Sequence, residues 1–190
     1  MLAGGLGRRL GGAKATVELR GRPLICYPLE ALAAVLGDVA IIAKADTLLP
    51  SLPGMTVWIE SQAPRHPLQG IVEALGLAGG RPVLACAVDL PFVTPELVSS
   101  LARADAAGAP AVVAAADGAL QPLLGRYQPS AAEPLALAAC EGVPVREAVA
   151  ALRPRLLAVE DLELLFNVNA PEDLLQAAAI LDRRMRETSA

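Results

Sequence analysis

The sequence has few of the residues on which metal cages, disulfide scaffolds and nucleic-acid surfaces depend. It contains one histidine, His66, and three widely spaced cysteines, Cys26, Cys86 and Cys140, with no C-x-x-C pair. A lone histidine excludes multi-histidine metal sites, and we expect each cysteine to be a small buried hydrophobe in a reduced compartment. Basic residues are not in excess: the formal net charge is −4 and the pI is near 5.1, which argues against a nucleic-acid-binding face.

The sequence also lacks a long uninterrupted apolar run, although 54% of its residues are hydrophobic and its mean hydropathy is +0.48. Charged residues break the apolar stretches, as Asp89 does after residues 83–88. None of them approaches the roughly 20 apolar residues of a membrane-spanning helix. Glycine and arginine follow Met1 almost at once, unlike a signal peptide. We therefore expect a cytoplasmic protein without membrane partners, folded as a single domain over residues 1–190.

Short β-type runs alternate with longer segments of helical periodicity. This alternation predicts an α/β protein with a three-layer, Rossmann-like arrangement, in which helices flank both faces of a mostly parallel sheet. The pattern of Gln121–Gln128 is compatible with a strand on the far side of the site but does not require one. The predicted strands are Val39–Ala43, Thr56–Ile59, Val83–Val88, Ala111–Ala115 and Leu156–Val159. The predicted helices are Pro23–Leu36, Leu68–Leu77, Pro95–Ala107, Arg146–Leu152 and Pro171–Arg186.

Two segments with unusual composition, Leu2–Lys14 and Val88–Pro95, fall where such sheets bind ligands, at the carboxyl ends of strands. The first packs five glycines and three cations into thirteen positions. Glycine lets backbone N–H groups turn toward phosphate oxygens, and arginine and lysine neutralise the phosphate charge. Leu2–Lys14 therefore predicts a polyphosphate-binding loop.

Spacing decides which kind of loop this is. The dinucleotide fingerprint G-x-G-x-x-G fails because Leu10 stands at its third glycine, which disfavours an NAD(P) oxidoreductase. The P-loop pattern fails because Ala13 separates Gly12 from Lys14. The pattern that fits is L-x-G-G-x-x-x-R-x-G-x-x-K, which is met by Leu2, Gly4, Gly5, Arg9, Gly11 and Lys14.

With this loop the sequence resembles the molybdenum cofactor guanylyltransferases, within the wider nucleotidyltransferase group that shares the loop. The likeness runs nearly end to end and implies a nucleotidyltransferase fold. The other matching motifs are G-R-P-L at 21–24, P-L-Q-G at 67–70, V-D-L-P-F at 88–92, Q-P at 121–122 and N-V-N-A-P-E-D at 167–173.

Two departures from the family pattern concern the same loop. Many family members have aspartate where this sequence has Ala13, which bears on how Lys14 is oriented. The family also has a hydrophobic, central strand before L-A-G-G, whereas Met1 directly precedes Leu2 here. The second departure predicts a misplaced start codon or a shortened chain, with a consequence for stability rather than for chemistry.

Asp89 is the predicted metal ligand. A carboxylate at the tip of a strand points into the crevice where phosphates collect, and its hard oxygens suit Mg²⁺. Thr94 before Pro95 fills the alternative role of helix cap better. The resemblance implies that Mg²⁺ is the cofactor, and that Lys14, Arg9 and Asp89 form the catalytic set, with Asp89 as metal ligand.

The resemblance further implies transfer of GMP from GTP to the terminal phosphate of molybdopterin, with release of pyrophosphate and delivery of the product to molybdoenzymes or their chaperones. A carboxylate at Glu60 would accept hydrogen bonds from guanine N1 and N2. The implied nucleotide-binding residues are Leu2, Ala3, Gly4, Gly5, Lys14, Glu60, Gly70 and Asp89. The implied acceptor-binding residues are Asn167, Asn169 and Arg146.

Three other functions stay open at this point. The chain could be a cytidylyltransferase for the same cofactor, a guanylyltransferase for a cobinamide or phospholactate acceptor, or a catalytically silent nucleotide-binding or chaperone module. The motif L-A-G-G at 2–5, rather than the L-A-A-G of cytidine enzymes, favours guanine. Joint retention of Lys14, Arg9 and Asp89 argues against a silent module.

Overall fold

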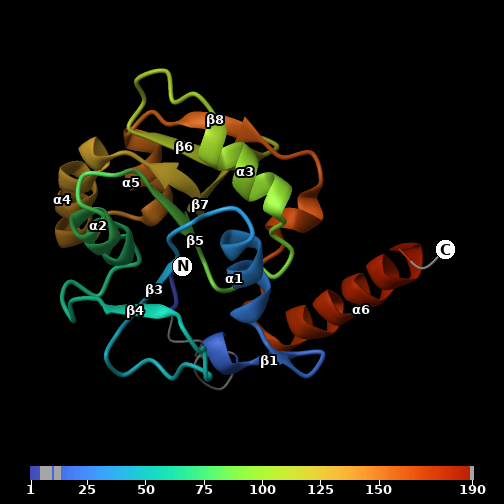
Figure 1. Ribbon diagram of the computed structural model, residues 1–190. Helices are drawn as coiled ribbons and strands as arrows, with labels where there is room; N and C mark the ends of the chain where they lie inside the picture. The colour runs from blue at the N-terminus through green and yellow to red at the C-terminus, as the bar shows by residue number, and fades with distance from the viewer. Residues whose placement is uncertain (5–9, 11–13, 189–190) are drawn as a thin grey trace.

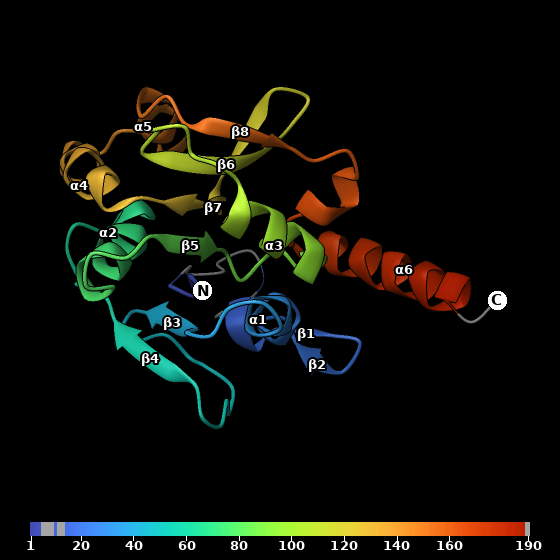
Figure 2. The same cartoon turned by 45° about the horizontal axis from the view of Figure 1, so that its top comes forward.

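The protein is a sheet covered on both faces by helices, as the sequence predicted (Figures 1 and 2). The computed structural model describes residues 1–4, 10 and 14–188. The strands are β1 (Glu18–Leu19), β2 (Arg22–Pro23), β3 (Ala40–Ala43), β4 (Thr56–Ile59), β5 (Val83–Cys86), β6 (Ala111–Ala116), β7 (Ala119–Tyr127) and β8 (Arg155–Ala158). The helices are α1 (Cys26–Ala33), α2 (Leu68–Leu77), α3 (Pro95–Arg103), α4 (Ala132–Glu141), α5 (Val145–Ala151) and α6 (Pro171–Thr188), with short 3-10 turns at Lys14–Thr16, Pro129–Ala131 and Leu162–Leu165.

The main sheet is mostly parallel. β3 pairs parallel with β4, and the second part has the order β5-β7-β6-β8, in which β7 runs antiparallel to both neighbours and β6 runs parallel to β8. Leu2 joins the two parts through parallel bridges to Ile42 and Ala87, and its N–H donates to the Cys86 carbonyl at 2.8 Å. Figure 2 shows this N-terminal segment between β3 and β5. Its position places Ala3 and Gly4 at the carboxyl ends of both strands.

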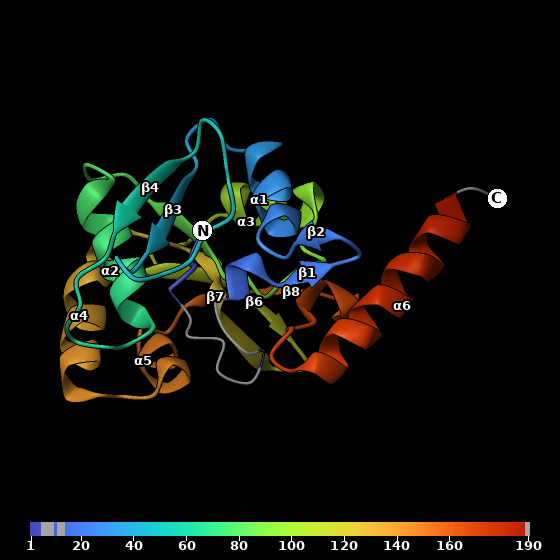
Figure 3. The same ribbon diagram turned by 90° about the horizontal axis from the view of Figure 1, so that it is seen from below.

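Strand β6 shows why the protein has three layers. Ala111 and Val113 pack into an apolar cluster with buried residues of α2, α4 and α5. Val112 and Ala114, which point to the opposite face, pack with α1 and α3. Because alternate side chains of a strand face opposite sides, a strand that is apolar throughout needs cover on both faces. Figure 3 shows the two groups of helices on either side of the sheet.

Several predicted boundaries are confirmed, but two helices are shorter than predicted: α1 ends at Ala33 rather than Leu36, and α3 ends at Arg103 rather than Ala107. β4 and α2 have the predicted limits, and Thr94 caps α3 by accepting from the Leu97 N–H at 3.3 Å. The predicted helix Pro23–Leu36 begins only at Cys26, because Pro23 pairs with Glu18 in the β1–β2 hairpin. The segment 121–128, for which a strand was possible but not required by the sequence, provides the greater part of β7. Helix α4 had no predicted counterpart.

Helix α6 extends away from the body of the molecule (Figure 1). Its base is held by an apolar cluster in which Ala177 and Ile180 meet Leu19, Leu24 and Phe92. This contact fixes the segment that precedes the helix against the loop after β5. Of the described helices, including this longest one, none combines the length and the apolar character needed to cross a membrane.

The prediction that every cysteine is buried is wrong for two of the three. Cys86 is fully buried, Cys26 is half-buried and Cys140 is exposed on α4. Burial raises the pKa of the Cys86 thiol to about 12, so this thiol stays protonated at neutral pH and behaves as an apolar group. Cys140 is the last-but-one residue of α4, a helix that was not predicted, so the expectation for this cysteine rested only on the usual burial of free cysteine.

Candidate nucleotide-binding site

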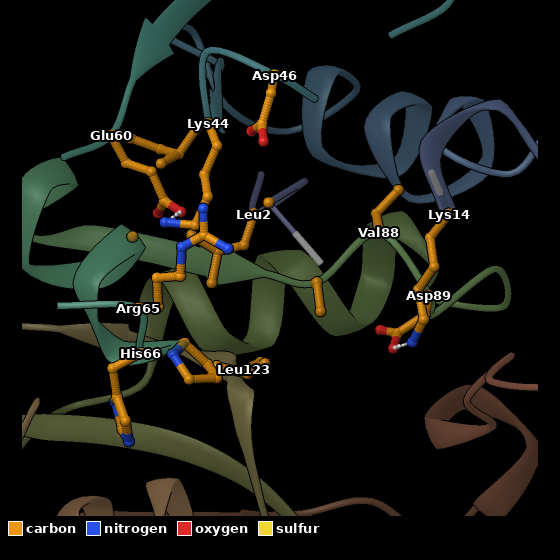
Figure 4. Close-up of a pocket in the computed structure, with 15 residues that line it drawn as sticks. Leu2, Lys14, Lys44, Asp46, Glu60, Arg65, His66, Val88, Asp89 and Leu123 are labelled. Carbon is orange, nitrogen blue, oxygen red and sulfur yellow. Dashed lines mark hydrogen bonds and ion pairs between the residues drawn. The ribbon is translucent and has the colours of Figure 1, made fainter. Parts of the chain in front are cut away.

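A cavity of about 320 Å³ opens at the carboxyl ends of three parallel strands (Figure 4). A polar residue that follows each strand reaches it: Lys44 after β3, Glu60 after β4 and Asp89 after β5. β3 and β5 are apolar and largely buried, whereas β4 is more exposed, and in all three the charged residue comes after the strand ends. The cavity therefore has apolar walls from the sheet and two ion pairs at its ends.

The first ion pair joins Lys14 to Asp89. The Lys14 Nζ lies 2.7 Å from Asp89 Oδ2 and also donates to Asn169 Oδ1 at 2.5 Å. The Asp89 carbonyl accepts from the Val168 N–H at 2.9 Å, which ties the loop after β5 to the segment before α6. Three segments far apart in the sequence thus converge on one ammonium group. Asp173 caps α6 through the N–H groups of residues 169 and 170, which leaves the Asn169 side chain for Lys14.

Asp89 also fits a divalent cation. Its Oδ1 atom is buried and has no hydrogen-bond partner among the residues that the structure describes. A buried carboxylate oxygen without a partner is costly unless a ligand completes it. The described residues hold no group of three or more histidine, cysteine, aspartate or glutamate side chains that could form a metal cage. One carboxylate with waters and substrate oxygens is the ligand set that Mg²⁺ commonly takes.

The second ion pair joins Lys44 to Glu60 at the opposite end of the cavity. Lys44 Nζ lies 2.7 Å from Glu60 Oε1, with only 11% and 8% of the two side chains exposed. Two glycines leave room beside this carboxylate: a Cβ on Gly4 would lie 2.7 Å from Oε1, and one on Gly70 would lie 3.1 Å from Oε2. Glycine at both positions therefore lets the cavity wall approach each oxygen of Glu60 without a clash.

A second cavity, of about 230 Å³, adjoins the first and shares Asp89 with it. Arg146, at the start of α5, and Asn167 line this second cavity together with Gln121 of β7. Asn167 itself donates to the Leu165 carbonyl at 2.9 Å. A ligand in the second cavity would meet a ligand in the first beside Asp89.

The structure brings most of the residues proposed from the sequence into these two cavities. Leu2, Gly4, Lys14, Glu60, Gly70 and Asp89 line the first, and Arg146 and Asn167 line the second with Asp89. Asn169 reaches the first cavity through Lys14, whereas Ala3 is buried behind it. The predicted residues Gly5 and Arg9 lie outside the described residues.

Sequence reasoning missed Lys44, together with Asp46, Arg65 and His66 of the same cavity. Figure 4 shows the Arg65 side chain pointing into this cavity from the loop before α2. Two signals could have found Lys44. It follows a buried strand, as Asp89 does, and it is one of only two lysines in a sequence with fourteen arginines. The other is Lys14, and both lysines line the cavity.

The fold is that of a nucleotidyltransferase. Residues 1–161 match the family model of the MobA-like NTP transferase domain. A molybdenum cofactor guanylyltransferase from Cereibacter sphaeroides is 36% identical over 191 residues, which cover 95% of either chain. The chain belongs to the MobA-like NTP transferase family.

Solved structures agree with this assignment. The crystal structure of molybdopterin-guanine dinucleotide biosynthesis protein A from Archaeoglobus fulgidus has a TM-score of 0.74 at 26% identity, covering 96% of this chain and 97% of that chain. A 2-C-methyl-D-erythritol 4-phosphate cytidylyltransferase from Thermus thermophilus has a TM-score of 0.67 at 22% identity, covering 94% and 96%. The second likeness shows the shared fold alone.

Proposed function

We propose that this protein transfers GMP from GTP to the terminal phosphate of molybdopterin and releases pyrophosphate, as one domain spanning residues 1–190. The observation that carries the proposal is the pair of adjoining cavities that share Asp89, one with a charged pair at each end. The name of the Cereibacter sphaeroides relative supports guanylyl transfer and a molybdenum cofactor acceptor.

The base belongs at the end of the first cavity that holds Lys44, Glu60 and Gly70, since those residues offer hydrogen-bonding groups without a phosphate-binding arrangement. The phosphates belong at the other end, where the ammonium of Lys14 lies beside Asp89. The acceptor phosphate then enters from the second cavity, past Arg146. This arrangement brings the α-phosphate of GTP and the acceptor phosphate together at Asp89.

The reaction requires neutralisation of the negative charge on the phosphates rather than a general base. A phosphate monoester has a second pKa of about 6 and is largely dianionic at neutral pH. An acceptor oxygen attacks the α-phosphorus, a new P–O bond forms, the bond to the oxygen bridging the α- and β-phosphorus breaks, and pyrophosphate leaves with that electron pair. Lys14 neutralises charge that develops on the phosphates, and by resemblance Arg9 assists it.

We assign Mg²⁺ to Asp89 Oδ1, the buried oxygen without a partner. Bound there, the ion would withdraw charge from phosphate oxygens during the transfer. Asp89 would hold it, while Lys14 and Asn169 fix the position of the carboxylate through the chain of contacts on Oδ2. Acceptor contacts from Asn167, Asn169 and Arg146 belong to the same proposal.

The test is pyrophosphate release from each of the four NTPs, with and without molybdopterin, in Mg²⁺ and after its removal by a chelator. We expect release with GTP only when molybdopterin and Mg²⁺ are both present. Equal release with CTP would identify a cytidylyltransferase instead. Turnover that survives complete chelation would contradict the assignment of Mg²⁺ to Asp89.

A further inference from the structure

We propose that Lys44 and Glu60 act as one unit that reads the guanine base, with the Lys44 ammonium donating to guanine O6. Lys44 is thereby a specificity-determining residue of the reaction. This inference rests on the proposed function, since it concerns how GTP is chosen.

The first argument is the order of the hydrogen-bonding groups along the wall of the cavity. Glu60 Oε2 lies on the side of Gly70, Glu60 Oε1 lies on the side of Gly4, and Lys44 Nζ lies 2.7 Å from Oε1. The wall therefore presents acceptor, acceptor and donor. The edge of guanine presents the N2 amino group, the N1–H and the O6 oxygen, which are donor, donor and acceptor. The two sets are complementary when the base places N2 toward Oε2 and O6 toward Lys44.

The second argument is burial. Both side chains of the pair are about nine-tenths buried, so each charge needs a partner of opposite sign. An ionised Glu60 can serve as a base reader in this setting only because the ammonium of Lys44 compensates it. The remaining contact of Lys44 Nζ is a long one, to the Ser61 carbonyl at 3.4 Å. An ammonium group has three donors, so a further acceptor can be bound without loss of the ion pair.

The third argument is the mismatch of other bases. Adenine presents an amino group where Lys44 donates and an unprotonated N1 where Glu60 accepts. Both charged groups would therefore lose their hydrogen bonds to the base. Hypoxanthine keeps O6 and N1–H but lacks the N2 donor, and it should therefore lose only the contact with Glu60 Oε2. Each atom of the base edge thus has its own partner, which makes the assignment testable atom by atom.

The experiment is calorimetric binding of GTP, 6-thio-GTP, ITP, ATP and CTP, with Mg²⁺ and without acceptor, to the unchanged protein and to Lys44→Met. Sulfur at position 6 is a much weaker acceptor than oxygen, and 6-thio-GTP keeps the N1 and N2 donors. In the unchanged protein we expect 6-thio-GTP to bind more weakly than GTP by about tenfold to a hundredfold, as for one hydrogen bond to a charged group. In Lys44→Met we expect GTP and 6-thio-GTP to bind with nearly equal affinity.

Two comparisons complete the design. Arg65→Met removes another cation of the same cavity, from an exposed position, and should leave the ratio of GTP to 6-thio-GTP affinity unchanged. Lys44→Gln keeps a neutral donor and should give an intermediate ratio. Lys44→Gln replaces Lys44→Met if the methionine variant does not fold. In addition, the comparison of GTP with 6-thio-GTP in the unchanged protein tests by itself whether O6 contacts a charged donor.

The proposal is overturned if Lys44→Met weakens GTP and 6-thio-GTP by the same factor, since Lys44 would then merely hold Glu60. It is equally overturned if the unchanged protein does not distinguish the two nucleotides. Failure of the proposed function has a different signature, namely tighter binding of CTP than GTP, or no binding of GTP at all.

Discussion

The two ion pairs of the cavity have the same chemistry but different surroundings. Each joins a lysine to a carboxylate that follows a strand, at 2.7 Å. Lys14 has an additional partner in Asn169, and Asp89 has one buried oxygen without a partner. Glu60, by contrast, has a glycine beside each oxygen. An ion pair with one carboxylate oxygen unpaired is suited to a cation, whereas one whose carboxylate is flanked by two glycines, which have no side chains, is suited to a flat base.

The largest difference between the two ends should appear on replacing Asp89. We expect Asp89→Asn to lower the rate of pyrophosphate release by about a hundredfold to a thousandfold, because the neutral amide cannot hold Mg²⁺ against the phosphates. The shape is kept and Lys14 retains Asn169, so the thermal unfolding midpoint should move little. Asp105→Asn, at an exposed aspartate that does not line the cavity, is the matched control. Near-full turnover of Asp89→Asn would remove the metal from this end.

Replacing the lysine of the same pair should separate rate from binding. We expect Lys14→Ala to lower kcat by about tenfold to a hundredfold with little change in the KM for GTP, because its charge acts mainly on the transition state. Steady-state kinetics of pyrophosphate release measures both quantities. A raised KM with an unchanged kcat would instead make Lys14 a contact to the bound phosphates of the ground state.

At the end of the cavity that holds Glu60, a substitution should change the affinity for GTP and the preference for GTP over ATP. We expect the unchanged protein to bind GTP more tightly than ATP, and Glu60→Gln to weaken GTP by about tenfold to a hundredfold, since it replaces hydrogen bonds to a charged group by neutral ones. ATP binding should change by much less, so the preference narrows. Competitive binding of the two nucleotides measures this directly, and an unchanged preference would rule out Glu60 as a base reader.

The smallest effect should come from closing the space beside Glu60, and one helix supplies both the test and its control. In Gly70→Ala the new Cβ would lie 2.9 Å from Leu2 Cδ2 and 3.1 Å from Glu60 Oε2, so GTP affinity should fall severalfold. In Gly76→Ala of the same helix nothing lies within 4 Å of the new Cβ. That variant should keep its GTP affinity and gain about 0.5–1 kcal/mol in unfolding free energy. Equal behaviour of the two variants would show that the space at Gly70 serves no ligand.

Local patterns in the sequence predicted local structure well. β4 and α2 have the predicted limits, and in each case one limit is set by a residue that interrupts the pattern: Glu60 follows β4, and Pro67 precedes α2. Helix α4 was missed because apolar residues lie on its exposed face as well as on its buried one: Leu135 is buried and Leu137 is exposed, so hydrophobicity along the sequence does not mark a single face. The β1–β2 hairpin was missed because two-residue strands carry no detectable periodicity.

In the site, too, residues that belong to local sequence motifs could be predicted, whereas contacts that depend on tertiary packing could not. Asp89 and Lys14 could be predicted because each belongs to a recognisable motif. The contact between Lys14 and Asn169 joins residues 155 positions apart, and only the packing of the segment before α6 against the loop after β5 creates it. Lys44 belongs to no motif, and its role depends on the parallel pairing of β3 with β4, which sets Lys44 beside Glu60. Sequence periodicity predicts strands but not which strands are neighbours.

The scarcity of lysine gives this protein a built-in spectroscopic probe. Because both lysine side chains of the sequence line one cavity, selective ¹⁵N labelling of lysine should give two ammonium resonances that report separately on its two ends. Titration with pyrophosphate should shift the resonance of Lys14, and titration with guanosine should shift that of Lys44.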